Sequence, residues 1–224
     1  MFDVDQWMEA FQRELSATFG DRLWFLGLQG SRARGEARQD SDIDVVVVLD
    51  ELSPADVKVY RTMLDGLDRR ELVCGFLSGK RELLGWDSAD LFQFYHDTRA
   101  IVGSLDDLKP LITDEAVRRA IKVGACNIYH ACVHNMVHER SEQILAELCK
   151  AAAFVIRADF FLQTHRFVGP LDELSQCTLG PQKRIVETLV ELRAGRAQDF
   201  DAISALLMEW TAGWVRVPME GEGT

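Results

Sequence analysis

The chain has 224 residues, of which 47% are hydrophobic, and carries a formal net charge of −11 with a pI near 4.9. This length allows one large domain or two small ones, and the acidic balance argues against binding extended nucleic acid, which clustered Lys and Arg would grip. The N-terminus lacks the basic and apolar blocks of a signal peptide, and no apolar run approaches about 18 residues, so we expect a cytoplasmic protein that does not span a membrane.

The cysteines favour neither a disulfide framework nor a zinc site. There are five of them, an odd number, and none stands in a CxxC spacing. We expect small buried thiols at Cys74, Cys126, Cys132, Cys149 and Cys177.

The first part of the chain predicts a helix followed by two strands. Residues 4–18 place large apolar side chains at helical spacing, and Gly20 is a stop signal. Two apolar runs, at residues 23–26 and 43–49, have the length and composition of short buried strands. The polar loop between them is therefore held between two core strands.

This loop ends in Asp42, Ile43 and Asp44. Side chains two residues apart on a strand point the same way, so Asp42 and Asp44 put two carboxylates on one face while Ile43 points to the other. Carboxylates that close repel one another unless a cation lies between them. Mg²⁺, which proteins hold through one or two carboxylates together with substrate phosphates, fits this pair. We expect Asp42 and Asp44 to be metal ligands and catalytic residues.

The start of the same loop suits a phosphate group. Gly30 lets the backbone approach a ligand closely, and Ser31 adds a hydroxyl beside its own N–H. Arg32 and Arg34 add fixed positive charge. These four are the candidate nucleotide-binding residues.

Beyond the second run the chain predicts a helix and two further strands. Ser53 and Pro54 supply a helix N-cap and a proline at the first helical position. Residues 71–77 form an apolar run that we expect to be a strand beside the one starting at residue 43. Residues 100–102 predict a short edge strand that closes the sheet before Gly103.

The spacing of the loop residues carries a resemblance to a known family. Gly30 and Ser31, ten intervening residues, and then Asp42 and Asp44 resemble the signature of the nucleotidyltransferase superfamily. The text GSRARGEARQDSDID is similar to its small bacterial members, the antibiotic nucleotidyltransferases and the minimal nucleotidyltransferases of toxin–antitoxin pairs. The resemblance covers residues 1–108. It implies an α/β (α+β) fold with a small mixed sheet and flanking helices, one or two Mg²⁺ ions, and an NTP, by family habit ATP.

The resemblance also implies a third carboxylate on the strand at residues 71–77, and here the sequence departs from it. The middle of that run holds no acid. Glu71, at the start of the run, would point to the same face of the strand as residue 73, so it is a candidate if the fold expects an acid at position 73. Its side chain would have to reach about 7 Å along the strand. His96 and Asp97 form another candidate acid/base pair, although adjacent side chains diverge, and surface polar residues are the more common explanation.

The remainder of the chain predicts an all-α domain. Pro110 separates the two parts, and four or five amphipathic helices in about 110 residues form a bundle. Helical patterns cover residues 113–136, 141–164, 180–194 and 200–214. We expect domains at 1–108 and 109–218, with a disordered tail at 219–224.

Histidines recur on the first of these helices at His130, His134 and His138, along one face. Two histidines at i, i+4 can bind a transition metal. Packing against the second helix, or an edge of the acceptor pocket, is the other interpretation. If they face the pocket, a neutral His or Glu139 could act as general base in place of the missing acid.

Two classes of function remain open. The first is an enzyme that moves a nucleoside monophosphate from an NTP to an acceptor hydroxyl of a small compound, such as an aminoglycoside-like one, whose positive charge acidic walls would suit. The second is an antitoxin-like nucleotidyltransferase that acts on a protein, or an inactive nucleotide-binding or interaction module. In either class the helical domain could supply a homodimer interface.

Overall fold

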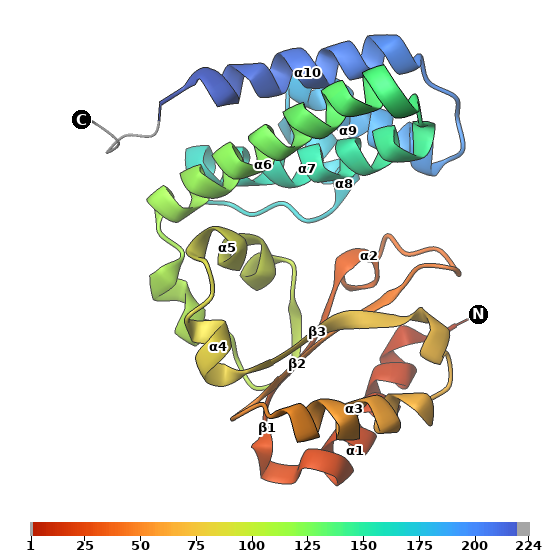
Figure 1. Cartoon of the computed structure of the whole chain (residues 1–224), viewed down its shortest axis with the longest axis vertical. Helices are drawn as coiled ribbons and strands as arrows, with labels where there is room; N and C mark the ends of the chain where they lie inside the picture. The colour runs from red at the N-terminus through yellow and green to blue at the C-terminus, as the bar shows by residue number, and fades with distance from the viewer. Residues whose placement is uncertain (1, 219–224) are drawn as a thin grey trace. The chain divides into compact units, whose positions relative to one another are not determined.

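The computed structural model describes residues 2–218 and has a four-stranded sheet in its N-terminal part. Figure 1 draws the chain, with this part in red to yellow. Its strands are β1 (Leu23–Gln29), β2 (Ile43–Leu49), β3 (Val73–Gly79) and β4 (Arg99–Val102), in the order β3-β2-β1-β4. β1 is antiparallel to both β2 and β4, and β2 is parallel to β3. The predicted mixed sheet, with its third strand beside the second, is confirmed.

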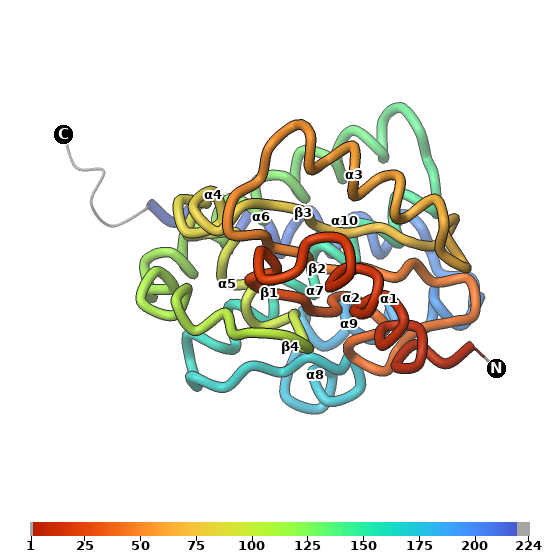
Figure 2. Tube along the Cα trace, turned by 90° about the horizontal axis from the view of Figure 1, so that it is seen from below, coloured from red at the N-terminus to blue at the C-terminus, as the bar shows by residue number. Residues whose placement is uncertain are grey.

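One face of the sheet packs against α1 (Val4–Phe19) and α3 (Pro54–Asp65), which pass in front of β1 and β2 in Figure 2. α1 contributes Phe11 to this core, and β2 contributes Ile43 and Val45. Because successive residues of a strand point to opposite faces, the residues between these in β2 belong to the other face. The apolar period of β2 thus builds the core and also orients its polar residues.

The sequence predicts a loop for the whole segment between β1 and β2, and the structure differs at its start. Gly30–Ala33 forms one helical turn, α2, because the Arg34 N–H donates to the Gly30 carbonyl at 3.2 Å. Two further helices, α4 (Lys80–Leu84) and α5 (Ser88–His96), precede β4.

The C-terminal part is helical, as predicted. Its elements are α6 (Asp114–His134), a π-helical turn (Asn135–Glu139), α7 (Glu142–Thr164), α8 (Leu171–Cys177), α9 (Gly180–Arg193) and α10 (Phe200–Arg216). Their buried apolar side chains form one cluster. The sequence prediction lacks α8, because seven residues are too short to show a helical period.

The chain divides into two compact units. The first comprises Met1–Asp87 and Phe94–Leu111, and the second comprises Ser88–Gln93 and Ile112–Thr224. Most of α5 therefore belongs with the helical unit rather than with the sheet. The expected domain boundary at residues 108 and 109 stays a prediction, and the expected disordered tail lies outside the described residues.

All five cysteines are free. Cys132 and Cys149 are buried, as expected, whereas Cys74 and Cys126 are exposed, so the expectation of buried thiols is wrong for these two. The reason for Cys74 is the sheet order, because β3 is an edge strand.

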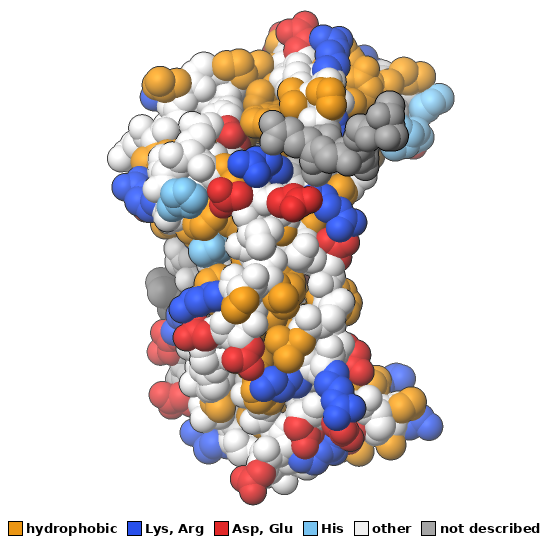
Figure 3. Space-filling model, turned by 90° about the vertical axis from the view of Figure 1, so that its left-hand side faces the viewer, with side chains coloured by type: hydrophobic (Ala, Val, Ile, Leu, Met, Phe, Trp, Pro, Cys, Tyr) orange, Lys and Arg blue, Asp and Glu red, His pale blue; other side chains and the backbone are white. Residues whose placement is uncertain are grey.

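Side chains of both charges stand on one face of the molecule (Figure 3). On the face drawn in Figure 3, Lys and Arg side chains stand among Asp and Glu side chains rather than in one basic stripe. Within residues 2–218 no helix has both the length and the apolar character needed to cross a membrane. The expected cytoplasmic location stays a prediction.

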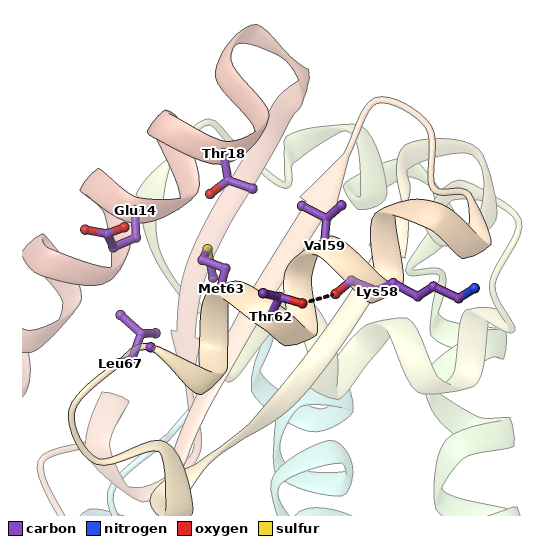
Figure 4. Close-up of a pocket in the computed structure, with 8 residues that line it drawn as sticks. Glu14, Thr18, Lys58, Val59, Thr62, Met63 and Leu67 are labelled. Carbon is purple, nitrogen blue, oxygen red and sulfur yellow. Dashed lines mark hydrogen bonds between the residues drawn. The ribbon is translucent and has the colours of Figure 1, made fainter.

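A groove of 640 Å³ runs between α1 and α3. Glu14 and Thr18 line it from α1, and Lys58 and Met63 from α3 (Figure 4). Because α1 and α3 cover the apolar face of the sheet, this groove lies on the side away from the polar residues of β2.

Arg22, just before β1, anchors the start of α3. Its guanidinium donates to both carboxylate oxygens of Asp56, at 2.8 and 3.1 Å. Asp56 also accepts from the N–H of Ser53, at 2.9 Å, in a capping box. The hydrogen bonds from Arg22 and then from Ser53 hold the pKa of the Asp56 carboxyl well below its ordinary range. This stabilisation therefore needs an ionised Asp56.

We expect Asp56→Asn to lower the melting temperature at pH 7, and the difference from wild type to shrink below about pH 4. A carboxyl whose pKa is lowered by folding stabilises the native state above its ordinary pKa, and this contribution is lost as the pH falls through the folded-state value. Melting curves at pH 7 and pH 3 measure this difference. The exposed Asp21→Asn is the control, and a difference independent of pH would contradict the prediction.

Candidate nucleotide and metal site

Asp44 lies on the face of the sheet that α1 and α3 leave uncovered, and Asp42 comes just before the same strand. Asp44 is half-buried in β2 opposite Gln29 of β1, and Asp42 is exposed just before the strand. Ile43 between them is fully buried in the core. The strand period therefore orients Asp44 as the sequence predicts, whereas Asp42 lies outside the strand. The expected direction of Asp42 and the binding of a metal by both carboxylates stay predictions.

Gly30 fits against Asp44 as no other residue could. Its φ of +73° lies in the left-handed region, and a Cβ added to it would stand 2.1 Å from Asp44 Oδ2. Gly30 directly follows Gln29, the β1 residue paired with Asp44. The backbone where the chain leaves β1 therefore touches a site carboxylate, which is the close approach that glycine permits.

Arg32 holds the backbone that leads into β2. Its side chain is largely buried, and Nε donates to the carbonyls of Ser41 and Asp42, at 3.2 and 3.0 Å. The guanidinium also lies 4.7 Å from the centre of the Phe2 ring. Burial lowers the pKa of Arg32, and the Asp42 and Asp44 carboxylates oppose that effect. Arg32 thus positions Asp42, and its contact with a nucleotide stays a prediction.

Arg34 is engaged in a nearly buried ion pair. Its Nη1 donates to both carboxylate oxygens of Asp97, at 2.5 and 2.6 Å, and its Nε donates to Glu36 at 3.1 Å. Burial lowers the pKa of Arg34, but the bonds to Asp97 and Glu36 outweigh it and raise the pKa. Asp97 is therefore a largely buried partner of Arg34 rather than a surface residue, and its pairing with His96 as acid and base stays a prediction. Nucleotide binding by Arg34 stays a prediction, and it would compete with these carboxylates.

The β2–β3 register shows where a third acid would stand. Asp44 pairs with Cys74, so Cys74 and Phe76 share its face, whereas Val73 pairs with Ile43 and faces the core. The expectation that Glu71 shares the face of the sheet on which a third acid would stand is therefore wrong. Glu71 lies in a 3-10 turn before β3 and shares the parity of Val73. No acid occupies the face of β3 that adjoins Asp44, and the exposed Cys74 takes that position.

The carboxylate pair suits a metal ion whose remaining ligands come from the substrate and from water. Among residues 2–218, no group of three or more His, Cys, Asp and Glu side chains is arranged to hold an ion. Asp42 and Asp44 would supply two oxygens, and nucleotide phosphates and water the rest, which is the usual ligand set of Mg²⁺.

The three histidines do not pack against the second helix. His130, His134 and His138 are all exposed, and the rings of His134 and His138 lie 4.7 Å apart. Packing between the helices is therefore a wrong interpretation, because α6 turns its other face to the core. Their role as general base stays a prediction.

The N-terminal part matches a known domain family. The family model described as nucleotidyltransferase domain covers residues 13–121. The fold is similar to that of spectinomycin adenyltransferase AAD(9) from Enterococcus faecialis, solved with ATP and spectinomycin. That match has 13% identity and a TM-score of 0.59, over 95% of this chain and 99% of that chain. A toxin–antitoxin structure with AMP-PNP matches with 19% identity and a TM-score of 0.36, over 53% of this chain and 90% of that chain. No curated protein matches the chain.

We expect Gly30→Ala to destabilise the protein by about 1–3 kcal/mol more than Gly35→Ala, because its methyl group must displace the Asp44 carboxylate. Gly35 is a matched control. It has the same φ of +73°, and nothing lies within 4 Å of an added Cβ. Urea denaturation of both variants measures the difference. Equal losses would show that strain at positive φ alone accounts for Gly30.

We expect Cys74→Asp to tighten the binding of Mn²⁺, used as a probe for Mg²⁺, by about tenfold, since a third carboxylate would join Asp44 on one face. Titration followed by electron paramagnetic resonance measures free Mn²⁺. Cys126→Asp, at the exposed cysteine of α6, is the control and should change nothing. Equal affinities in the Cys74→Asp and Cys126→Asp variants would contradict the placement of the site.

Proposed function

Since residues 13–121 form a nucleotidyltransferase domain, we propose that the protein transfers a nucleoside monophosphate from an NTP, with ATP as the first choice, to an acceptor hydroxyl. The acceptor oxygen forms a bond to the α-phosphorus, the bond from that phosphorus to the bridging oxygen breaks, and pyrophosphate leaves. The observation that carries this proposal is the close packing of Gly30 on Asp44. It brings the backbone of the candidate phosphate-binding residues and a site carboxylate together.

In this reaction Asp42 and Asp44 would hold Mg²⁺, which supplies charge neutralisation on the transferring phosphoryl group. Gly30 and Ser31 would bind the triphosphate through backbone N–H groups and the hydroxyl. Arg32 keeps Asp42 in place through its bonds to the carbonyls of Ser41 and Asp42. The acceptor hydroxyl gives up its proton to water in this scheme, because Cys74 stands where a carboxylate base would be.

A small hydroxyl-bearing compound is the first class of acceptor to test. The fold resembles that of a spectinomycin adenyltransferase over 95% of this chain, which supports this choice at the level of fold. The net charge of −11 favours a cationic acceptor, such as an aminoglycoside-like compound.

A nucleotide-binding module without transfer is the second candidate. The observation that favours it is the face of β3 beside Asp44, where Cys74 and Phe76 stand and no carboxylate completes the set. A transferase and a binding module share the metal and phosphate contacts, so nucleotide binding alone does not separate them. Pyrophosphate release does.

We expect one or more NTPs to stabilise the wild type only when Mg²⁺ is present, and to leave Asp42→Asn/Asp44→Asn unshifted. A ligand at about 100 times its Kd adds about 2.7 kcal/mol of stability, which a thermal melt resolves. Asp21→Asn/Asp68→Asn removes the same charge elsewhere and serves as the control.

Two results would contradict the transferase proposal. If NTP with Mg²⁺ stabilises the Asp42→Asn/Asp44→Asn variant as much as wild type, the two aspartates do not take part in binding. Tight, Mg²⁺-dependent binding without pyrophosphate release, across a panel of hydroxyl acceptors that includes aminoglycosides, would favour the second candidate.

A further inference from the structure

Three aromatic side chains gather on the same face of the sheet as Asp44. The ring of Phe76 lies 5.3 Å from the ring of Trp86 and 5.0 Å from the ring of Phe94, and both contacts are edge-to-face. Phe76 and Phe94 are half-buried, whereas Trp86 is 45% exposed. Trp86 is thus the outer ring of the cluster, supported by Phe76.

The cluster lies close to the two carboxylates. Cys74 is the β3 partner of Asp44, and Phe76 follows two residues later on the same face, about 7 Å along the strand. Phe76, Trp86 and Phe94 all belong to the same unit as Asp44. A metal-bound phosphate at the carboxylates and a planar group at Trp86 would therefore be within the reach of one ligand.

The chemistry of the cluster suits a flat π-system. A large aromatic side chain that stays well exposed on a rigid support is suited to recognition, because its ring is already ordered and gains contact area when a second ring covers it. Stacking of this kind tolerates any base, since every base has a π-face. Within the cluster the side chains are hydrocarbon apart from the indole N–H, so it offers little hydrogen bonding with which to choose among bases.

We propose that Trp86 stacks on the nucleobase of the bound NTP and that this contact, rather than hydrogen bonding to the base edge, supplies the affinity for the base. The inference rests on the proposed function, because the triphosphate must be anchored at Gly30 and the two aspartates. It assigns Trp86 a binding role for the base, with Phe76 as the residue that positions it.

The test compares ATP with inorganic triphosphate, which has the phosphates and no base. Calorimetry with Mg²⁺ gives the Kd of both for wild type, Trp86→Ala, Trp86→Phe and Trp24→Ala. We expect Trp86→Ala to raise the Kd of ATP by about 5- to 150-fold and to leave the Kd of triphosphate unchanged. Trp86→Phe keeps a ring and should recover most of the loss. Trp24, which packs with Lys80 and Phe25, is the control for loss of an indole from this unit.

The outcomes separate the inference from the function on which it rests. If Trp86→Ala binds ATP as wild type does, while triphosphate and ATP still need Mg²⁺ and both aspartates, the stacking role is overturned and the proposed function stands. If Trp86→Ala weakens triphosphate as much as ATP, the residue supports the phosphate site and the stacking role is again overturned. If wild type binds neither ligand, both proposals fail.

Discussion

The candidate site depends on a single close contact between the end of β1 and the second residue of β2. Asp44 faces Gln29 across the antiparallel ladder, and Gly30 follows at once, with a backbone geometry that leaves no room for a side chain beside Asp44 Oδ2. A shift of the ladder by one residue would turn Asp44 into the apolar core and Ile43 out of it, at the cost of burying a charge. The core beneath α1 and α3 therefore fixes the register, and the register fixes the chemistry on the opposite face.

Charges buried in the first unit hold the loop between these strands in place. Arg32 donates to backbone carbonyls next to Asp42, and Arg34 donates to Asp97 from the segment before β4. A buried guanidinium left without partners is strongly destabilising, so each conformation of the loop that breaks these bonds is disfavoured. The same bonds set a limit on function. A phosphate that recruited Arg34 would have to displace Asp97, whereas one bound through Gly30 and Ser31 would not.

Local patterns in the sequence are enough to predict the strands and the direction of Asp44, because strand period and core burial act over a few residues. Contacts between residues that are far apart in the sequence cannot be predicted from such patterns. The pairing of Asp44 with Cys74 depends on how two parallel strands align, and a shift of one residue changes the face of the sheet on which Glu71 is expected. The Arg34–Asp97 pair joins residues 63 positions apart, and nothing in the spacing of their neighbours marks it. The loop motif alone, by contrast, predicts the domain family whose model matches residues 13–121.

The electrostatics of the site bear on how a metal would reach it. The buried Arg32 guanidinium lies near enough to the Asp42 and Asp44 carboxylates for their charges to act on the pKa of Arg32. This fixed cation offsets part of the repulsion between Asp42 and Asp44, so the pair can stay in place before any ion arrives. With Cys74 where a third acid would stand, the protein by itself offers an ion less negative charge than three carboxylates would. If the site binds a metal as proposed, its affinity would depend strongly on the nucleotide phosphates, which would supply the missing negative charge. On the proposed function, Mg²⁺ would enter as a complex with the NTP, and the binding of metal and of nucleotide would be one coupled event.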